Sequence, residues 1–139
     1  MLNDPLYIVW ANKNNLDIPI IDEQHRGIVS IINSLYYFIK QGIGFQALLP
    51  TIIIMEQYSI IHFEAEQMML KKYDYTDYDN HFLLHAHLRE NIKAIKAQSF
   101  LNKDPDATIN FLKNWWISHI NVEDKKYERW ISAQQNLSI

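Results

Sequence analysis

The chain has 139 residues, a hydrophobic fraction of 48%, a formal net charge of −3 and no cysteine. This size predicts one domain with enough apolar material for a real core. The lack of cysteine excludes disulfides, thiolate–zinc sites, iron–sulfur clusters and cysteine nucleophiles. We find no basic stripe, no secretory signal and no apolar run long enough to cross a bilayer. We therefore expect a cytoplasmic protein with neither a nucleic-acid nor a membrane partner.

Residues 1–21 carry scattered apolar side chains and several asparagines, which predicts an irregular N-terminal arm. Asp22 is a suitable N-cap for a first helix. Apolar residues and one histidine then recur every three or four positions over 25–39, as they do on one face of a helix. Gly42 and Gly44 are expected to end that helix.

A second helix is expected to begin shortly before Pro50, because proline is tolerated in a first turn. A third helical stripe covers 78–95, and the segment before it lacks the pattern. Asp104 and Pro105 are an N-cap and first-position pair for a fourth helix, which should run to about Ile131.

Four amphipathic helices with short connections predict an all-α protein, an antiparallel up-down-up-down four-helix bundle. No sustained alternation of apolar and polar residues suggests a strand. We assign 1–139 to a single domain, with the arm over 1–21 and the bundle over 22–133. The outer faces of the bundle are expected to be ordinary mixed polar surfaces.

Every expected helix places at least one histidine on its inward stripe, and two helices add an acid. His62 with Glu66, and His81 with His85, are four residues apart, so each pair shares one face of a helix. Imidazoles and carboxylates that face an apolar interior are costly unless they are satisfied, and a metal does this best. The candidate ligands are His25, His62, Glu66, His81, His85 and His119, with one further acid on the fourth helix.

A single inward histidine is usually a core residue bonded to a carbonyl, so the prediction depends on the joint pattern across four helices. His87 and Glu64 point away from their stripes and are left out. On the fourth helix, Asp124 is rotated by about 140° from His119, whereas Glu123 is four residues on and is the better partner by helical geometry. The spacing does not decide whether Glu123 or Asp124 is the ligand.

Five imidazoles and two carboxylates are too many ligands for one ion. Two ions bridged by both acids and by an oxo or hydroxo group would use all but one position of two octahedra, and the open position would bind a small ligand. Iron, zinc, copper and manganese all accept such donors, so the residues do not choose the metal.

With Asp124 as the seventh ligand, the full set resembles the hemerythrin family, most closely its single-domain bacterial members. The segment 21–26, Trp10 and Asn114-Trp115 are also similar to family positions. The resemblance implies a non-haem di-iron centre that binds O₂ reversibly, for transport, storage or sensing. One iron would take His81, His85 and His119, and the other would take His25 and His62 and keep the open position, with Glu66 and Asp124 as bridges.

The same resemblance implies an apolar O₂ pocket. Its expected residues are Ile28, Phe63, Trp115, Trp116 and Ile120. Their ordinary role is core packing, and a dry pocket protects the bound ligand from water and protons. Trp116 departs from the family, which tends to carry a leucine there, and its larger ring would narrow the pocket.

We expect an O₂-binding protein and not an enzyme, with an unidentified protein acceptor if it delivers O₂. The alternative is a di-iron enzyme that acts on O₂, peroxide or nitric oxide. The chain lacks the Glu-x-x-His pairs that are typical of carboxylate-rich di-iron bundles, which favours binding over catalysis. A third interpretation is a bundle that holds zinc or stores iron.

Overall fold

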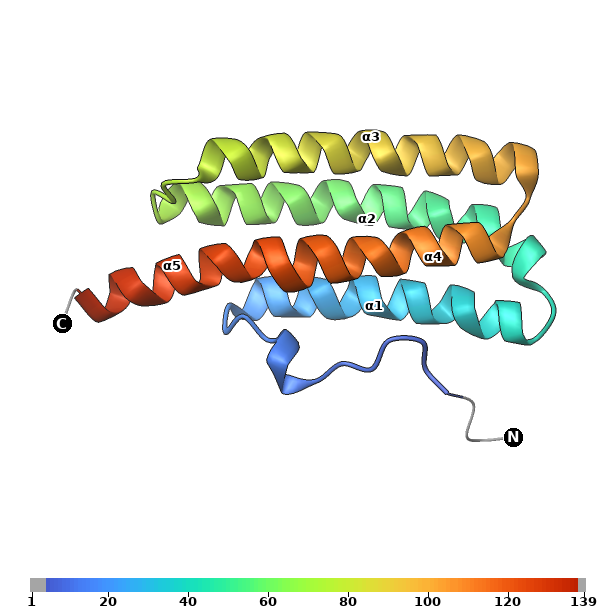
Figure 1. The fold of residues 1–139 in the computed structure, drawn as a ribbon, viewed down its shortest axis with the longest axis horizontal. Coiled ribbons are helices and arrows are strands. Elements are labelled where there is room, and N and C mark those ends of the chain that lie inside the picture. Colours follow the sequence, from blue (N-terminus) through green and yellow to red (C-terminus); the bar gives the residue numbers. More distant parts are fainter. Residues whose placement is uncertain (1–4, 138–139) are drawn as a thin grey trace.

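Four helical rods, each antiparallel to the next, make up the computed structural model, which describes residues 5–137 (Figure 1). The fourth rod is continuous but has three parts, because a π-helix joins two α-helices. The elements are α1 (Pro19–Lys40), α2 (Gly44–Lys72), α3 (Tyr78–Asn102), α4 (Pro105–Trp115), the π-helix η2 (Trp116–Glu123) and α5 (Asp124–Leu137). The predicted all-α antiparallel bundle is confirmed.

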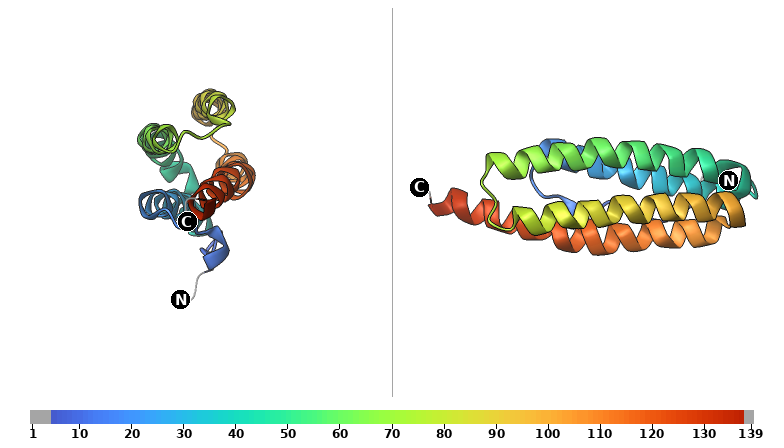
Figure 2. Two further views of the ribbon diagram at one scale, coloured as in Figure 1. Left: turned by 90° about the vertical axis from the view of Figure 1, so that its left-hand side faces the viewer. Right: turned by 90° about the horizontal axis from the view of Figure 1, so that it is seen from above.

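The rods stand at the corners of a four-sided bundle (Figure 2). Helix α2 packs against α1 and α3, and the fourth rod closes the bundle against α1 and α3. Asp104 caps α4 as predicted: its carboxylate accepts hydrogen bonds from the backbone N–H groups of Asp106 and Ala107, and Pro105 takes the first position.

Two helix starts differ from the sequence prediction. Helix α1 begins at Pro19, so Asp22 lies in its first turn, where its carboxylate accepts a hydrogen bond from the N–H of Leu16 at 2.7 Å. Helix α2 begins at Gly44, which places Pro50 inside the helix and not in its first turn. Gly42 ends α1 as expected, with a positive φ of 79° that glycine adopts without strain.

The N-terminal arm is irregular apart from a 3₁₀ turn over Asn12–Asn14, and it lies along α1. Asn33 fixes it by exchanging two hydrogen bonds of 2.8 Å with the backbone of Ile8. Asn14 donates to the side chain of Asn121 at 2.8 Å, which ties the arm to the fourth rod. Residues 1–4 of the predicted arm lie outside the described residues.

The bundle interior contains two apolar clusters. The larger cluster includes Ile28, Phe63 and Trp116, and the smaller one includes Ile21 and Tyr127. The predicted inward stripes are buried along most of their length, and the two side chains that the sequence analysis turned outward, His87 and Glu64, are exposed.

Gly27 allows α1 and α2 to approach closely beside the buried histidines. A Cβ at this position would overlap the ring and hydroxyl of Tyr58, whose Oη donates to the carbonyl of Gln24 at 3.0 Å. We expect Gly27→Ala to destabilise the protein by about 1–2 kcal/mol, because overpacking outweighs the better helix propensity of alanine. Urea unfolding measures this difference.

Tyr58→Phe is the matched background, since it removes the atom nearest to the new methyl group. In the Tyr58→Phe background, Gly27→Ala should lower the free energy of unfolding by less than it does in the parent chain. An unchanged or higher stability of Gly27→Ala in the parent chain would contradict the close contact.

Candidate metal centre

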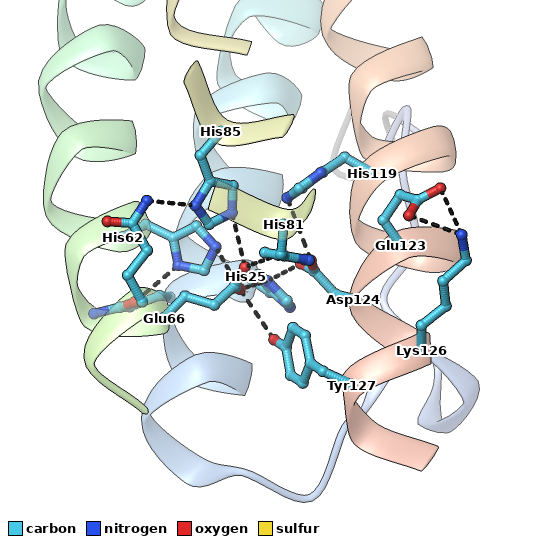
Figure 3. A network of polar contacts seen from close by, with 12 residues as sticks. His25, His62, Glu66, His81, His85, His119, Glu123, Asp124, Lys126 and Tyr127 are labelled. Atoms are coloured by element: carbon cyan, nitrogen blue, oxygen red, sulfur yellow. Dashed lines mark hydrogen bonds and ion pairs between the residues drawn. The ribbon is translucent and has the colours of Figure 1, made fainter. Parts of the chain in front are cut away.

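Seven side chains from all four rods meet between the two apolar clusters, towards one end of the bundle (Figure 3). All seven are buried, and five of them have no more than 1% of their surface exposed. They are the five histidines and two acids of the predicted set: His25, His62, Glu66, His81, His85, His119 and Asp124.

The potential ligand atoms form two groups, and the atoms within each group lie within 4.8 Å of one another. The first group is Glu66, His81, His85 and His119, and the second is His25, His62, Glu66 and Asp124. Glu66 belongs to both. Each group has the size of a site for one ion, so the arrangement offers two neighbouring cation sites that share a carboxylate.

Glu66 divides its two oxygens between the groups. Its Oε1 lies 2.7 Å from Nε2 of His81 and 2.9 Å from Nε2 of His85. Its Oε2 lies 3.3 Å from Nε2 of His62 and 3.8 Å from Nε2 of His25. One oxygen therefore faces each group, as a bridging carboxylate requires.

Asp124 divides its oxygens in the same way. Its Oδ1 lies 3.2 Å from Nε2 of His81 and 3.3 Å from Nε2 of His119, and its Oδ2 lies 3.1 Å from Nε2 of His25. Glu123, the other acid left open by the sequence, instead pairs with Lys126 at 2.9 Å, on the outside of the rod. Only Asp124 reaches the buried cluster.

The π-helix explains why an acid five residues after His119 shares its face. Within η2 the backbone N–H of Asp124 bonds to the carbonyl of His119, an i→i+5 bond that widens the helical turn. In an α-helix Asp124 would be rotated by about 140° from His119. The wider turn cancels most of that rotation and directs both side chains inward.

The cluster contains buried polar atoms with no hydrogen-bond partner. They include Nε2 of His25, His62 and His119 and both carboxylate oxygens of Asp124. Buried polar groups are normally hydrogen-bonded, and nitrogen and oxygen lone pairs that converge in this way are typical of a cation-binding site. The nitrogen and oxygen donors present are those that iron, zinc, copper and manganese accept, so the residues fit a metal centre.

Protonation balances the charge of this cluster when no metal is bound. Burial opposes a charge on His25 and His81, but the carboxylates of Asp124 and Glu66 outweigh it and raise the two pKa values to about 9 and about 10. For His119, burial prevails and lowers the pKa to about 4. Burial would raise the pKa of Glu66, yet the surrounding histidines hold it well below its usual value. Protons thus occupy the place of cations between the acids.

A second layer of side chains holds the ligands in position. Nδ1 of His62 lies 2.8 Å from Oε1 of Gln24, and Nδ1 of His85 lies 3.1 Å from the amide of Gln67. Oε1 of Gln24 accepts the ring proton from Nδ1 of His62, which leaves Nε2 of that ring free to bind a metal, whereas the amide nitrogen of Gln67 faces Nδ1 of His85 as a donor. Tyr127 donates to Oε2 of Glu66 at 3.0 Å, and burial together with the nearby acids raises the pKa of its hydroxyl well above the usual value.

The sequence analysis did not identify these three supporting residues. Gln24 and Gln67 each adjoin a predicted ligand, and Tyr127 follows Asp124 by one helical turn. Their positions beside the predicted ligands could have indicated a supporting role. Many residues that do not support a ligand have the same spacing, so the sequence alone did not identify these three.

Aromatic side chains close the cluster on the side of the larger apolar core. Phe63 stacks on His85 with ring centroids 4.1 Å apart. Trp116 meets His25 edge-on at 6.1 Å, and Trp10 of the arm lies 5.7 Å from Trp116. All five residues of the expected O₂ pocket are buried in this core cluster.

Among the described helices, none combines the length and apolar character that a membrane crossing needs.

Comparison with known proteins points to one family. The family model described as the hemerythrin HHE cation binding domain matches residues 16–131. The bacteriohemerythrin of Pseudomonas paraeruginosa is 26% identical, over 87% of this chain and 79% of its own length. That of Clostridium acetobutylicum is 25% identical, over 86% of this chain and 97% of its own. A solved leucine-to-alanine mutant of hemerythrin has the same fold, with a TM-score of 0.79 and 21% identity over 92% of this chain and 99% of its own.

Tyr127→Phe tests the support that Tyr127 gives to Glu66. Loss of this hydrogen bond should weaken metal binding about tenfold, the usual scale for removing a partner of a ligand. Competition with a chromophoric chelator measures the affinity for Fe²⁺ or Zn²⁺. Tyr75→Phe is the control, because Tyr75 packs edge-on against Tyr127 at 6.3 Å and makes no hydrogen bond to either acid among those found in the described chain. Equal affinities in the two variants would remove Tyr127 from this role.

Proposed function

Because this chain belongs to the hemerythrin family, we propose that its buried histidine and carboxylate cluster binds two iron ions and that the loaded centre binds O₂ reversibly. The divided carboxylates are the observation that carries the proposal. Glu66 and Asp124 each direct one carboxylate oxygen towards the first group of histidines and the other oxygen towards the second. Two bridged ions need this arrangement. The bacteriohemerythrins that the chain resembles support the choice of iron and O₂.

The proposed ligand sets follow the two groups. One iron takes only histidines from α3 and the fourth rod, besides the bridges, and the other takes the histidines of α1 and α2. The first set is His81, His85 and His119, the second is His25 and His62, and the bridges are Glu66 and Asp124. The second iron has one protein ligand fewer, so we assign the open position for O₂ to it.

When bound, the two irons supply the electrons that O₂ takes up on binding and returns on release. The chain's contribution is to hold the ligands still and to keep water out. Gln24 keeps the ring proton of His62 on Nδ1, and Tyr127 keeps its own proton while bonding to Glu66. The pocket that we propose for O₂ contains no ionisable side chain: it consists of Ile28, Phe63, Trp115, Trp116 and Ile120.

We infer a role in O₂ transport, storage or sensing, and an unidentified acceptor protein is required only for delivery. A di-iron enzyme acting on O₂, peroxide or nitric oxide is the alternative. The ligand set favours binding, since five neutral nitrogen donors and two carboxylates stabilise reduced iron better than a carboxylate-rich set does.

An optical spectrum tests the proposal directly. Iron-loaded, reduced protein should develop a visible charge-transfer band in air, and the band should disappear when O₂ is removed. His62→Ala should abolish the band, because it removes a ligand from the iron with the open position. Rapid, irreversible oxidation of the parent protein would instead favour the enzyme.

A pair of adjacent acids tests the bridge on the fourth rod. Asp124→Asn should lower the iron content below two per chain, since it weakens a bridge between the ions. Glu123→Gln, which removes a charge one residue away, should leave two irons bound because Glu123 pairs with Lys126 on the outside. Iron analysis after gel filtration gives the stoichiometry, and the opposite order of effects would make Glu123 the ligand.

A further inference from the structure

The N-terminal arm contacts the fourth rod along η2, the π-helix that leads to the proposed bridging acid. Trp10 lies 5.7 Å from Trp116, the first residue of η2, measured between ring centroids. Asn14 donates a hydrogen bond of 2.8 Å to the side chain of Asn121, in the second half of η2. A short segment of the arm therefore contacts most of the length of the π-helix.

The next residues of the arm contact the rod just beyond η2. Lys125 donates from its Nζ to the backbone carbonyl of Asn15 at 3.0 Å. Leu16, which is 2% exposed, belongs to the same small apolar cluster as Tyr127. The arm therefore holds the rod on both sides of Asp124.

Asn14 is suited to join the two segments because both ends of its side-chain amide are bonded. The residue is buried, its Oδ1 accepts a hydrogen bond of 2.9 Å from the N–H of Ala11, and its Nδ2 donates to Asn121. Its backbone N–H also donates to the carbonyl of Ala11 at 2.9 Å. Because an unpaired buried amide is costly, Asn14 and Asn121 have one favourable relative position.

A π-helix needs support of this kind. Wide i→i+5 turns are rare, and the same residues could instead form an α-helix with i→i+4 bonds. That change would rotate the rod beyond η2 by about 100° and turn the carboxylate of Asp124 away from the cluster. Trp116 precedes the wide turn and Lys125 follows it, so contacts with the arm at both positions oppose the rotation.

We propose that the arm holds η2 in its π-helical register and thereby positions Asp124 as a bridge, with Asn14 and Asn121 as the positioning residues. Neither asparagine belongs to the two groups of potential ligands found in the described chain. Both act through the backbone of the rod. The inference rests on the proposed function only in requiring that the cluster binds metal, and it is independent of iron and O₂.

The affinity for Zn²⁺ tests the positioning role. Asn14→Ala should weaken Zn²⁺ binding about tenfold, because it removes a buried hydrogen bond that holds the wide turn. Ser99→Ala is the control: it removes a buried hydrogen bond of 2.7 Å to Thr108, fourteen residues along α3 from His85, or about 21 Å away. It should lower the free energy of unfolding and leave the Zn²⁺ affinity unchanged. Equal losses of affinity in the two variants, or no loss in Asn14→Ala, would overturn the proposal.

Two substitutions at Asn121 separate its hydrogen bond from packing. Asn121→Asp keeps an acceptor for the Nδ2 of Asn14 and should keep the Zn²⁺ affinity of the parent chain. Asn121→Leu fills a similar volume without an acceptor, so it should weaken Zn²⁺ binding about tenfold. Competition with a chromophoric chelator measures both affinities, and equal affinities in the two variants would contradict the role of the hydrogen bond.

Amide hydrogen exchange in the metal-free chain tests the wide turn without any metal. At equal free energy of unfolding, the N–H of Asp124 should exchange faster in Asn121→Leu than in Ser99→Ala, because only the first variant loosens the bond to the carbonyl of His119. Equal exchange rates in a chain that binds Zn²⁺ would overturn this inference alone. A parent chain that binds no Zn²⁺, iron or other divalent cation would overturn the proposed function.

Discussion

Five imidazoles and two carboxylates share one dry layer between two apolar clusters, and the rest of the bundle is arranged around this constraint. These side chains are buried from bulk solvent, and an unbalanced buried charge costs several kcal/mol. The layer is stable only when positive charge lies between the acids. In the metal-free chain that charge is carried by protons on His25 and His81. Bound cations would replace those protons, so metal binding and folding are thermodynamically linked in this chain.

The sequence predicted the features that depend on regular periodicity. The inward stripes, the exposed positions of His87 and Glu64 and the cap at Asp104 follow from helical spacing and cap chemistry, and the structure shows all of them. The start of α1 was wrong, because Asp22 resembles an N-cap but bonds to the arm from within the first turn. Pro50 was misplaced because α2 already begins at Gly44, and the ring of Pro50 lies on the exposed side of the helix.

The choice between two adjacent acids could not be made from helical periodicity. An ideal α-helix favours Glu123, and only the family resemblance pointed to Asp124. The structure supplies the physical reason, since the i→i+5 bond between Asp124 and His119 changes the local period of the rod. The residue types in η2 do not predict a π-helix. The wider turn is favoured by what Asp124 reaches in three dimensions, namely His25 on α1 and His81 on α3.

Helix α2 shows why an apolar sequence need not mean a single buried face. Its inner face supplies His62 and Glu66 to the buried cluster, and the adjacent Ile61 is 61% exposed on the outside of the bundle. The exposed isoleucines of α2 lie on either side of Gln57 and Glu64, so its outer face mixes apolar and polar side chains. Helix α2 carries one bridge and one ligand of the iron to which we assign O₂, so the packing of its inner face and the geometry of the proposed centre depend on the same rod.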